Sequence, residues 1–171
     1  GYLAVSFEQA GYGQRLEKHL KKKSNDRTID FSNHLVLLGK SLMGNGATEI
    51  SYLLDWLINN KTLKIDKNRI FLFGHSSGGT LAQFAAALDV RIKGTLASGS
   101  VGPIRETIGS RGSGSGDGIV PGFLKWFDSH DLLALIAPRK FVGLSADKDH
   151  IFPYSGTYKV INKAKGFYKK L

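Results

Sequence analysis

The chain has 171 residues, 42% of them hydrophobic and 22% charged, which is ordinary for a single globular domain with a sizeable core. It contains no cysteine, and this excludes disulfides, thiolate metal sites and a cysteine nucleophile. The formal net charge is +10, but the lysines are scattered, no aromatic stacking motif lies among them and no apolar run reaches membrane-spanning length. We therefore expect a lysine-rich solvated surface, with no nucleic-acid and no membrane partner.

The first 27 residues predict a strand followed by irregular chain. Residues 2–7 are apolar and predict a short strand, and residues 8–13 form a glycine-punctuated loop that leaves its end. Residues 14–27 are polar and basic without a sustained period, which predicts an exposed excursion.

Two helices are predicted before the next strand. Apolar residues recur at helical spacing over 31–42, with Asp30 or Ser32 available as the N-cap, and the glycines at 44–46 are expected to end this helix. A second amphipathic stripe over 50–58 predicts another helix.

The sequence Gly74-His75-Ser76-Ser77-Gly78 organises the rest of the chain. It follows the apolar run 70–73, which is typical of a parallel strand covered on both faces, and it precedes a helix-forming segment that ends at Leu88. This is the G-x-S-x-G motif in its strand–turn–helix setting. Bulky neighbours would collide in so sharp a turn, so Gly74 and Gly78 are expected to relieve the crowding, and Gly79 to let the helix approach the strand.

In this setting Ser76 is the expected nucleophile and Ser77 the expected oxyanion-hole residue. The Ser76 hydroxyl would project beyond the carboxyl end of the sheet, and the Ser77 N–H at the helix N-terminus would face the oxyanion of acyl transfer. Ser77 does not fit as the nucleophile, because His75 rather than a glycine stands two residues before it. The alternative is a glycine-rich turn with a capping serine.

The C-terminal half alternates strands and helices. We expect a strand at 92–98, a Gly/Ser-rich loop at 99–118, short helices at 121–127 and 131–137, a strand at 141–144 and a final helix at 157–171. Asp131 is the expected cap of its helix, and residues 110–118 are expected to be among the least ordered. The alternation predicts an α/β fold, doubly wound around a mostly parallel sheet.

A second candidate cluster follows the strand at 141–144. The loop at 145–153 carries Asp147 and Asp149, whose carboxylates would share a sheet edge with Ser76. An acid there can orient an imidazole and stabilise the imidazolium that forms when it takes the serine proton, and the order serine then acid is that of α/β-hydrolases. The alternative is a solvated turn.

Four segments together resemble the α/β-hydrolase superfamily, in its dienelactone hydrolase and acetyl xylan esterase-like branch. They are GHSSG at 74–78, ASGS at 97–100, VPGFLKWFDSHDLLALIAPR at 120–139 and SADKDHIFP at 145–153. The resemblance covers nearly the whole chain and implies that Ser76 is the nucleophile and Asp149 the acid, because Asp149 matches the family pattern K-D-x-x-x-P. Asp147 is the second choice.

The chain departs from this family at both ends. The family's base histidine follows the acid by tens of residues, and none of the five histidines fits that place; His150 adjoins the acid and is only a substitute candidate. Residues 1–15 resemble the family's strand and G-x-G loop, with Glu8 near the usual aspartate. The strand and loop that precede it in the family are absent, and that strand would lie between residues 2–7 and 70–73. We therefore expect residues 1–171 to be a single partial domain, lacking N-terminal strands and the C-terminal histidine segment.

The resulting prediction is a serine hydrolase that cleaves carboxylic esters through an acyl-enzyme, with a small-molecule ester as substrate and no metal or organic cofactor. The fragment alone is expected to be inactive. The alternatives are a peptidase domain of the prolyl oligopeptidase type and a non-catalytic hydrolase-like binding domain. The sequence leaves the oligomeric state and the localisation undetermined.

Overall fold

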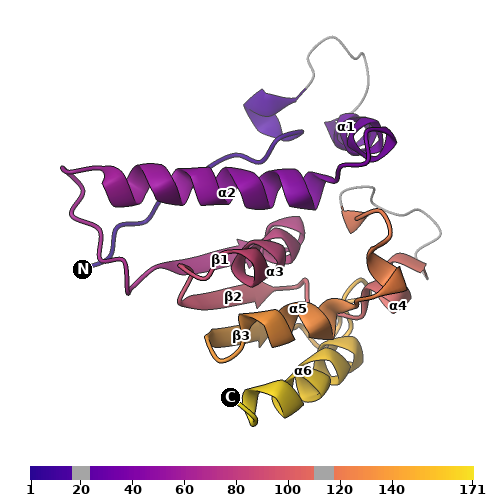
Figure 1. Cartoon of the computed structure of the whole chain (residues 1–171). Coiled ribbons are helices and arrows are strands. Elements are labelled where there is room, and N and C mark those ends of the chain that lie inside the picture. The colour runs from indigo at the N-terminus through magenta and orange to yellow at the C-terminus, as the bar shows by residue number, and fades with distance from the viewer. Residues whose placement is uncertain (17–23, 110–117) are drawn as a thin grey trace.

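The structure is a computed structural model that describes residues 1–16, 24–109 and 118–171. A short 3-10 turn, η1 (Gly13–Arg15), precedes two helices, and alternating strands and helices follow (Figure 1). The elements are α1 (Ser24–Leu37), α2 (Leu42–Asn59), β1 (Phe71–His75), α3 (Ser77–Leu88), β2 (Gly94–Ser98), α4 (Ile104–Gly109), the 3-10 turn η3 (Phe123–Lys125), α5 (Ser129–Ile136), β3 (Lys140–Leu144) and α6 (Tyr154–Tyr168).

The three strands form one parallel sheet in the order β1-β2-β3. Phe71 pairs with Gly94 and Gly94 with Lys140, and the register continues to the row of His75, Ser98 and Leu144. Because all three strands run the same way, their carboxyl ends meet at one edge, where ligands bind in open α/β sheets. The predicted α/β class with a parallel sheet is confirmed, with the three strands of an incomplete sheet.

One face of the sheet carries the core. Helix α3 packs on β1 and β2, α2 packs on α3, and α5 lies between α3 and α6. The larger core cluster is centred on apolar side chains of α2, α3 and α5, such as Met43, Leu81 and Ile136. A smaller cluster joins Ala97 of β2 to Val160 of α6. This burial holds the carboxyl edge of the sheet in a fixed position relative to the helices.

The opposite face of the sheet is exposed among the described residues. Phe71 and Phe73 of β1 are 53% and 67% exposed, and Val142 and Leu144 of β3 are each 48% exposed. Side chains alternate across a strand, so these four residues share the face that α3 does not cover. The apolar run was expected to be covered on both faces; helices of the described part cover one of them.

The strand predicted at residues 2–7 is wrong for this structure. These residues take no strand pairing, and Tyr2 and Leu3 are largely exposed. An apolar groove of about 500 Å³, lined by Leu3 and Val5 on one side and by Phe71 and Leu72 on the other, lies between this segment and β1. A strand forms only when a neighbouring strand pairs with its backbone. The groove separates residues 2–7 from β1, so the two backbones do not pair.

The boundaries of the first two helices also differ from the prediction. Asp30 and Ser32 lie inside α1 and not at its start, and the glycines at 44–46 lie inside α2 instead of ending a helix. Ser41 caps α2, because its hydroxyl accepts the Gly44 N–H at 3.0 Å. A side chain at Gly46 would crowd Leu81 of α3, so this glycine permits close packing of two helices. Of the predicted excursion at 14–27, residues 17–23 lie outside the described part.

In the C-terminal half the elements are confirmed with shifted ends. Only Phe123–Lys125 of the helix predicted at 121–127 is helical, as a 3-10 turn. Asp128, not Asp131, caps α5: the Asp128 carboxylate accepts the Ser129 N–H, and Asp131 completes the capping box from the first turn. The disorder predicted for 110–118 concerns a segment of which 110–117 lies outside the described residues.

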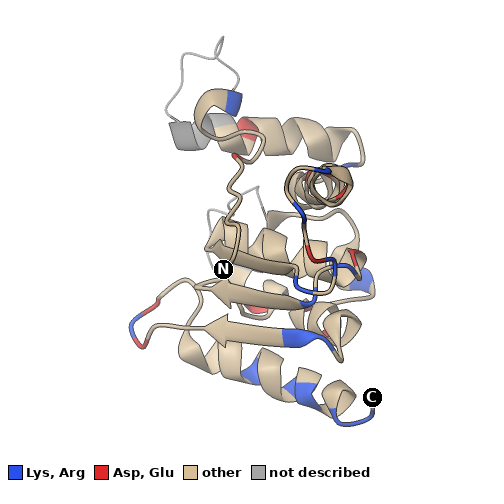
Figure 2. Cartoon of the chain, turned by 90° about the vertical axis from the view of Figure 1, so that its left-hand side faces the viewer, with Lys and Arg blue, Asp and Glu red and all other residues tan. Residues whose placement is uncertain are grey.

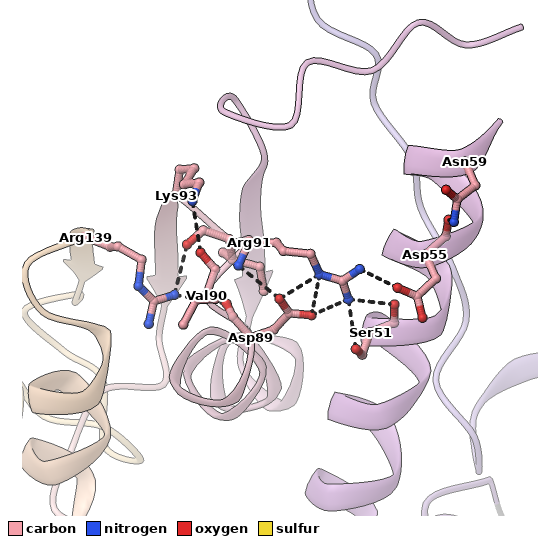
Figure 3. A network of polar contacts seen from close by, with 9 residues as sticks. Ser51, Asp55, Asn59, Asp89, Val90, Arg91, Lys93 and Arg139 are labelled. Atoms are coloured by element: carbon pink, nitrogen blue, oxygen red, sulfur yellow. Dashed lines mark hydrogen bonds and ion pairs between the residues drawn. The ribbon is translucent and has the colours of Figure 1, made fainter. Parts of the chain in front are cut away.

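At the amino edge of the sheet, Arg91 ties α2 to the turn after α3 (Figure 3). Its guanidinium donates to the Asp89 carboxylate at 2.6–3.1 Å, to the Ser51 hydroxyl at 2.9 Å and to Asp55. Arg91 holds the pKa of Asp89 below its usual range, chiefly through the hydrogen bonds. This network lies at the opposite edge from Ser76 and fixes the scaffold.

The basic residues are spread over several elements, with repeated lysines on α6 and others in the loops (Figure 2). Within the described residues, none of the helices has the length and apolar character to cross a membrane.

Candidate active site

Ser76 occupies a sharp turn between β1 and α3. Its backbone has φ 53° and ψ −123°, in the positive-φ range that residues other than glycine rarely adopt. The turn is fixed on both sides, because the Ser76 N–H donates to the Ser98 carbonyl at 2.8 Å and the Ser76 carbonyl accepts the Gly79 N–H at 2.9 Å. A strained backbone conformation of this kind persists only where the surrounding bonds impose it. In this conformation the Ser76 side chain is exposed at the carboxyl edge of the sheet.

Two of the three glycines around this turn are sterically required. A Cβ at Gly74 would overlap the Gly78 carbonyl oxygen, and a Cβ at Gly79 would overlap the Ser100 hydroxyl. The predicted need for Gly74 and Gly79 therefore has a direct structural cause. Gly78 differs from the prediction, since an added Cβ would meet only the Gln9 side-chain amide at an ordinary 3.5 Å. Gly78 has room for a side chain because its carbonyl group, and not its Cα, lies against Gly74.

Ser77 is the first residue of α3, so its N–H is one of the helix N-terminal amides that lack an intrahelical acceptor. These amides and the helix dipole favour negative charge at this end. The Ser77 hydroxyl accepts a hydrogen bond from the Tyr12 hydroxyl at 3.3 Å. The glycine-rich loop after residue 7 thus contacts the turn, a contact that the sequence alone did not reveal.

Asp149 lies in the loop after β3, at the same edge of the sheet as Ser76. Its Oδ1 accepts the backbone N–H groups of Ile151 at 2.8 Å and Phe152 at 2.9 Å, which fixes the carboxylate. A Cβ built on Gly99 would lie 3.6 Å from Asp149 Oδ2 and 3.2 Å from His75 Cε1, so the carboxylate faces the loop after β2. Asp147, the second choice, is exposed.

Among the described residues, no hydrogen bond or ion pair joins a histidine to the Ser76 side chain. His75 Nδ1 lies 3.1 Å from the Ser98 hydroxyl, and His130 Nε2 lies 3.6 Å from the Asp131 carboxylate. His34 and His150 are exposed, and His19 lies outside the described residues. Among the described residues there is also no cluster of acids and histidines fit to hold a metal ion.

A pocket of about 60 Å³ opens beside Ser76 and Ser77. Its apolar walls come from five elements or loops, through Met43, Phe84, Ile104, Leu132 and Phe152. Its polar lining includes Gln83 and Ser100, two residues that sequence reasoning missed. Gln83 could have been noticed as a polar residue inside the apolar helix segment LAQFAAAL, where it is buried.

The comparisons with known proteins agree on the fold. No family model matches the chain. It is 26% identical over 170 residues to a Bacillus subtilis (strain 168) protein named "Putative hydrolase YtaP". Among solved structures, a glucuronoyl esterase from Solibacter usitatus superposes with a TM-score of 0.61 at 25% identity over 75% of the chain. A carbohydrate esterase family 15 glucuronoyl esterase from Caldicellulosiruptor kristjansonii superposes with 0.66 at 21% identity over 91%.

This chain has the α/β-hydrolase fold. It spans 54% of the length of the curated relative, and 36% and 48% of the two esterase chains. The fold expected from the sequence is confirmed, the two solved structures are glucuronoyl esterases, and the dienelactone hydrolase and acetyl xylan esterase-like branch stays a prediction. The similarity concerns the fold, and the roles of individual residues rest on the local geometry.

Proposed function

We propose that the protein containing this chain is a serine hydrolase that cleaves small-molecule carboxylic esters through an acyl-enzyme, with Ser76 as nucleophile in a G-H-S-S-G elbow. The observation that carries the proposal is the turn itself: a positive-φ serine between a parallel strand and a helix, beside a pocket. The esterase relatives favour ester hydrolysis over the peptidase and non-catalytic alternatives.

In the proposed reaction the Ser76 Oγ attacks the ester carbonyl carbon and its proton passes to a base. The C=O electron pair moves onto oxygen, and the Ser77 N–H at the start of α3 stabilises that oxyanion. Collapse of the tetrahedral intermediate expels the alcohol, which takes the proton, and leaves the acyl group on Ser76. Water then attacks the acyl carbon by the same route, releasing the acid.

Asp149 is the proposed acid of the triad and orients the base. Its carboxylate is fixed by two backbone N–H groups and faces the loop after β2, whereas Asp147 is exposed. The base is proposed to be a histidine outside residues 1–171, because no hydrogen bond joins a described histidine to the Ser76 hydroxyl. This chain alone is accordingly expected to turn over esters close to background.

The test is p-nitrophenyl acetate hydrolysis by the full-length protein and its variants. Ser76→Ala should lower kcat by ~10⁴-fold or more. Ser77→Ala is the matched control and should retain activity within about tenfold, because the proposed oxyanion donor is a backbone group. Asp149→Asn should lower kcat about 10⁴-fold, because the acid no longer holds the base histidine in the correct tautomer, whereas Asp147→Asn should change kcat little. Full activity in Ser76→Ala would overturn the proposal.

A further inference from the structure

We propose that the outer face of α2 carries a binding site for a neutral, extended chain of pyranose sugars, centred on Tyr52 and Trp56. This site goes beyond the proposed hydrolysis at Ser76 and does not depend on it. It follows from two exposed aromatic rings, from the polar side chains that frame them and from the small area that the rings offer.

Tyr52 and Trp56 lie about one turn apart on the solvent side of α2. Tyr52 is 69% exposed and Trp56 is 59% exposed, whereas Leu54 and Leu57 of the same helix are buried. Residues four apart on a helix are neighbours, and both side chains line one shallow depression of about 440 Å³. Single exposed apolar side chains are ordinary, but an adjacent pair that lines a depression indicates a surface for a ligand.

Polar side chains with unused hydrogen-bonding atoms complete the lining of this depression. They are Asp55, Asn59 and Asn60. Arg91 donates to Asp55 Oδ1, Asn59 Nδ2 donates to the Asp55 carbonyl at 2.9 Å, and Asn60 Oδ1 accepts the Thr62 N–H at 3.0 Å. Within the part of the chain that the structure describes, Asp55 Oδ2, Asn59 Oδ1 and Asn60 Nδ2 make no hydrogen bond. Each side chain is therefore fixed by one atom and offers a ligand another.

The chemistry of a pyranose ring matches this arrangement. Its faces present C–H groups and its rim presents hydroxyls, so a face can stack on an aromatic ring while the rim bonds to carboxylate and amide groups. Arg91 compensates the charge of Asp55, and none of the described lining residues is cationic, so a nucleotide or another anion has no counter-charge here.

The spacing of the two rings favours an extended sugar chain. Four residues of helix rise about 6 Å along the axis, which is close to the repeat of a β-1,4-linked chain of pyranose rings. Successive sugar rings of such a chain can therefore meet Tyr52 and Trp56 in turn. A coiled α-1,4-linked chain cannot keep both rings in line with the helix.

The area of the rings argues against a protein partner or a second copy of this chain. Tyr and Trp side chains bury about 150–250 Å² each when fully covered, so this partly covered pair offers under about 400 Å². A specific protein interface needs about 800 Å² from each partner. The neighbouring positions on this face include Thr48, Glu49 and Asn59, so the apolar area does not continue beyond the pair.

The proposed sugar site lies away from the nucleophile. Met43, in the first turn of α2, lines the pocket beside Ser76. Trp56 lies in the second half of the same long helix (Figure 1), roughly 20 Å further along at about 1.5 Å per residue. Loss of the sugar site should therefore leave the hydrolysis of a small ester unchanged.

The experiment measures cellohexaose binding to the full-length protein by isothermal titration calorimetry. We expect saturable binding that Trp56→Ala weakens about tenfold, because stacking on the indole is lost, and that Tyr52→Ala weakens about threefold. Trp56→Phe keeps an aromatic ring and should lose less affinity than Trp56→Ala. Maltohexaose, whose α-1,4 linkages coil the chain, should bind more weakly than cellohexaose.

Trp126→Ala is the matched control. Trp126 is 82% exposed but does not line the depression, so this variant should keep the affinity. Trp56→Ala replaces an exposed side chain, so it should unfold at the same urea concentration as the unaltered protein and hydrolyse p-nitrophenyl acetate at the same rate. Absence of saturable binding, equal affinity in Trp56→Ala or equal binding of maltohexaose overturns the inference. A failure of Ser76 as nucleophile is seen separately, in the hydrolysis assay.

Discussion

Replacing Arg91 with methionine should destabilise the scaffold without touching the site. Arg91 donates three hydrogen bonds to Asp89, whose side chain is only 11% exposed, and joins them to Ser51 and Asp55 of α2. Methionine keeps the apolar stem but leaves the Asp89 carboxylate without this partner. Breaking a fully buried pair costs about 3–5 kcal/mol; because Arg91 is partly exposed, we expect about 2 kcal/mol.

The assay is urea unfolding followed by circular dichroism at pH 7 and at lower pH. The pKa of Asp89 is lowered in the folded state, so its contribution is present above its ordinary pKa of about 3.9 and is lost as the pH falls through the lowered folded pKa. The difference between Arg91→Met and the unaltered chain should therefore shrink in acid. Lys159→Met, which removes an exposed ion pair with Glu106, is the control and should cost under about 0.5 kcal/mol. Equal losses in both variants would refute the reasoning.

Three further changes test other parts of the account. Gly74→Ala should destabilise the chain by at least about 2 kcal/mol in urea unfolding because the new Cβ overlaps the Gly78 carbonyl, and Gly78→Ala by clearly less; the reverse order would contradict the described turn. Phe73→Ser should reduce the fluorescence of an apolar-surface dye, since Phe73 shares the open sheet face with the exposed Phe71, Val142 and Leu144; unchanged fluorescence would contradict an exposed face. Purified residues 1–171 should hydrolyse p-nitrophenyl acetate near background; robust turnover lost in Ser76→Ala would place a base within this chain, with His150 the first candidate.

The sequence predicted well those features that depend on local chemistry. The strand–turn–helix at Ser76 could be predicted because a run of apolar residues, closely spaced glycines and a helix-forming segment all constrain the same few residues. The parallel α/β class followed from the alternation of elements, and Gly74 was expected to relieve crowding because the turn brings backbone onto backbone.

Features that depend on distant partners were less predictable. Gly46 looked like a helix end, but its role is to admit Leu81 of a neighbouring helix, which no local pattern reveals. The apolar residues 2–7 looked like a strand, and whether they pair depends on a neighbour across a groove. Asp131 looked like the N-cap because both acids of the capping box, Asp128 at the N-cap and Asp131 three residues later, accept backbone N–H groups.

The most direct test of the central claim is covalent labelling of the full-length protein with a fluorophosphonate. The nucleophile's oxygen bonds to phosphorus and fluoride departs, so mass spectrometry of the digested protein locates the attacking residue. We expect a single adduct on the peptide containing Ser76, formed in parallel with loss of esterase activity, absent in Ser76→Ala and retained in Ser77→Ala. An adduct on another residue that accompanies the loss of activity would contradict it.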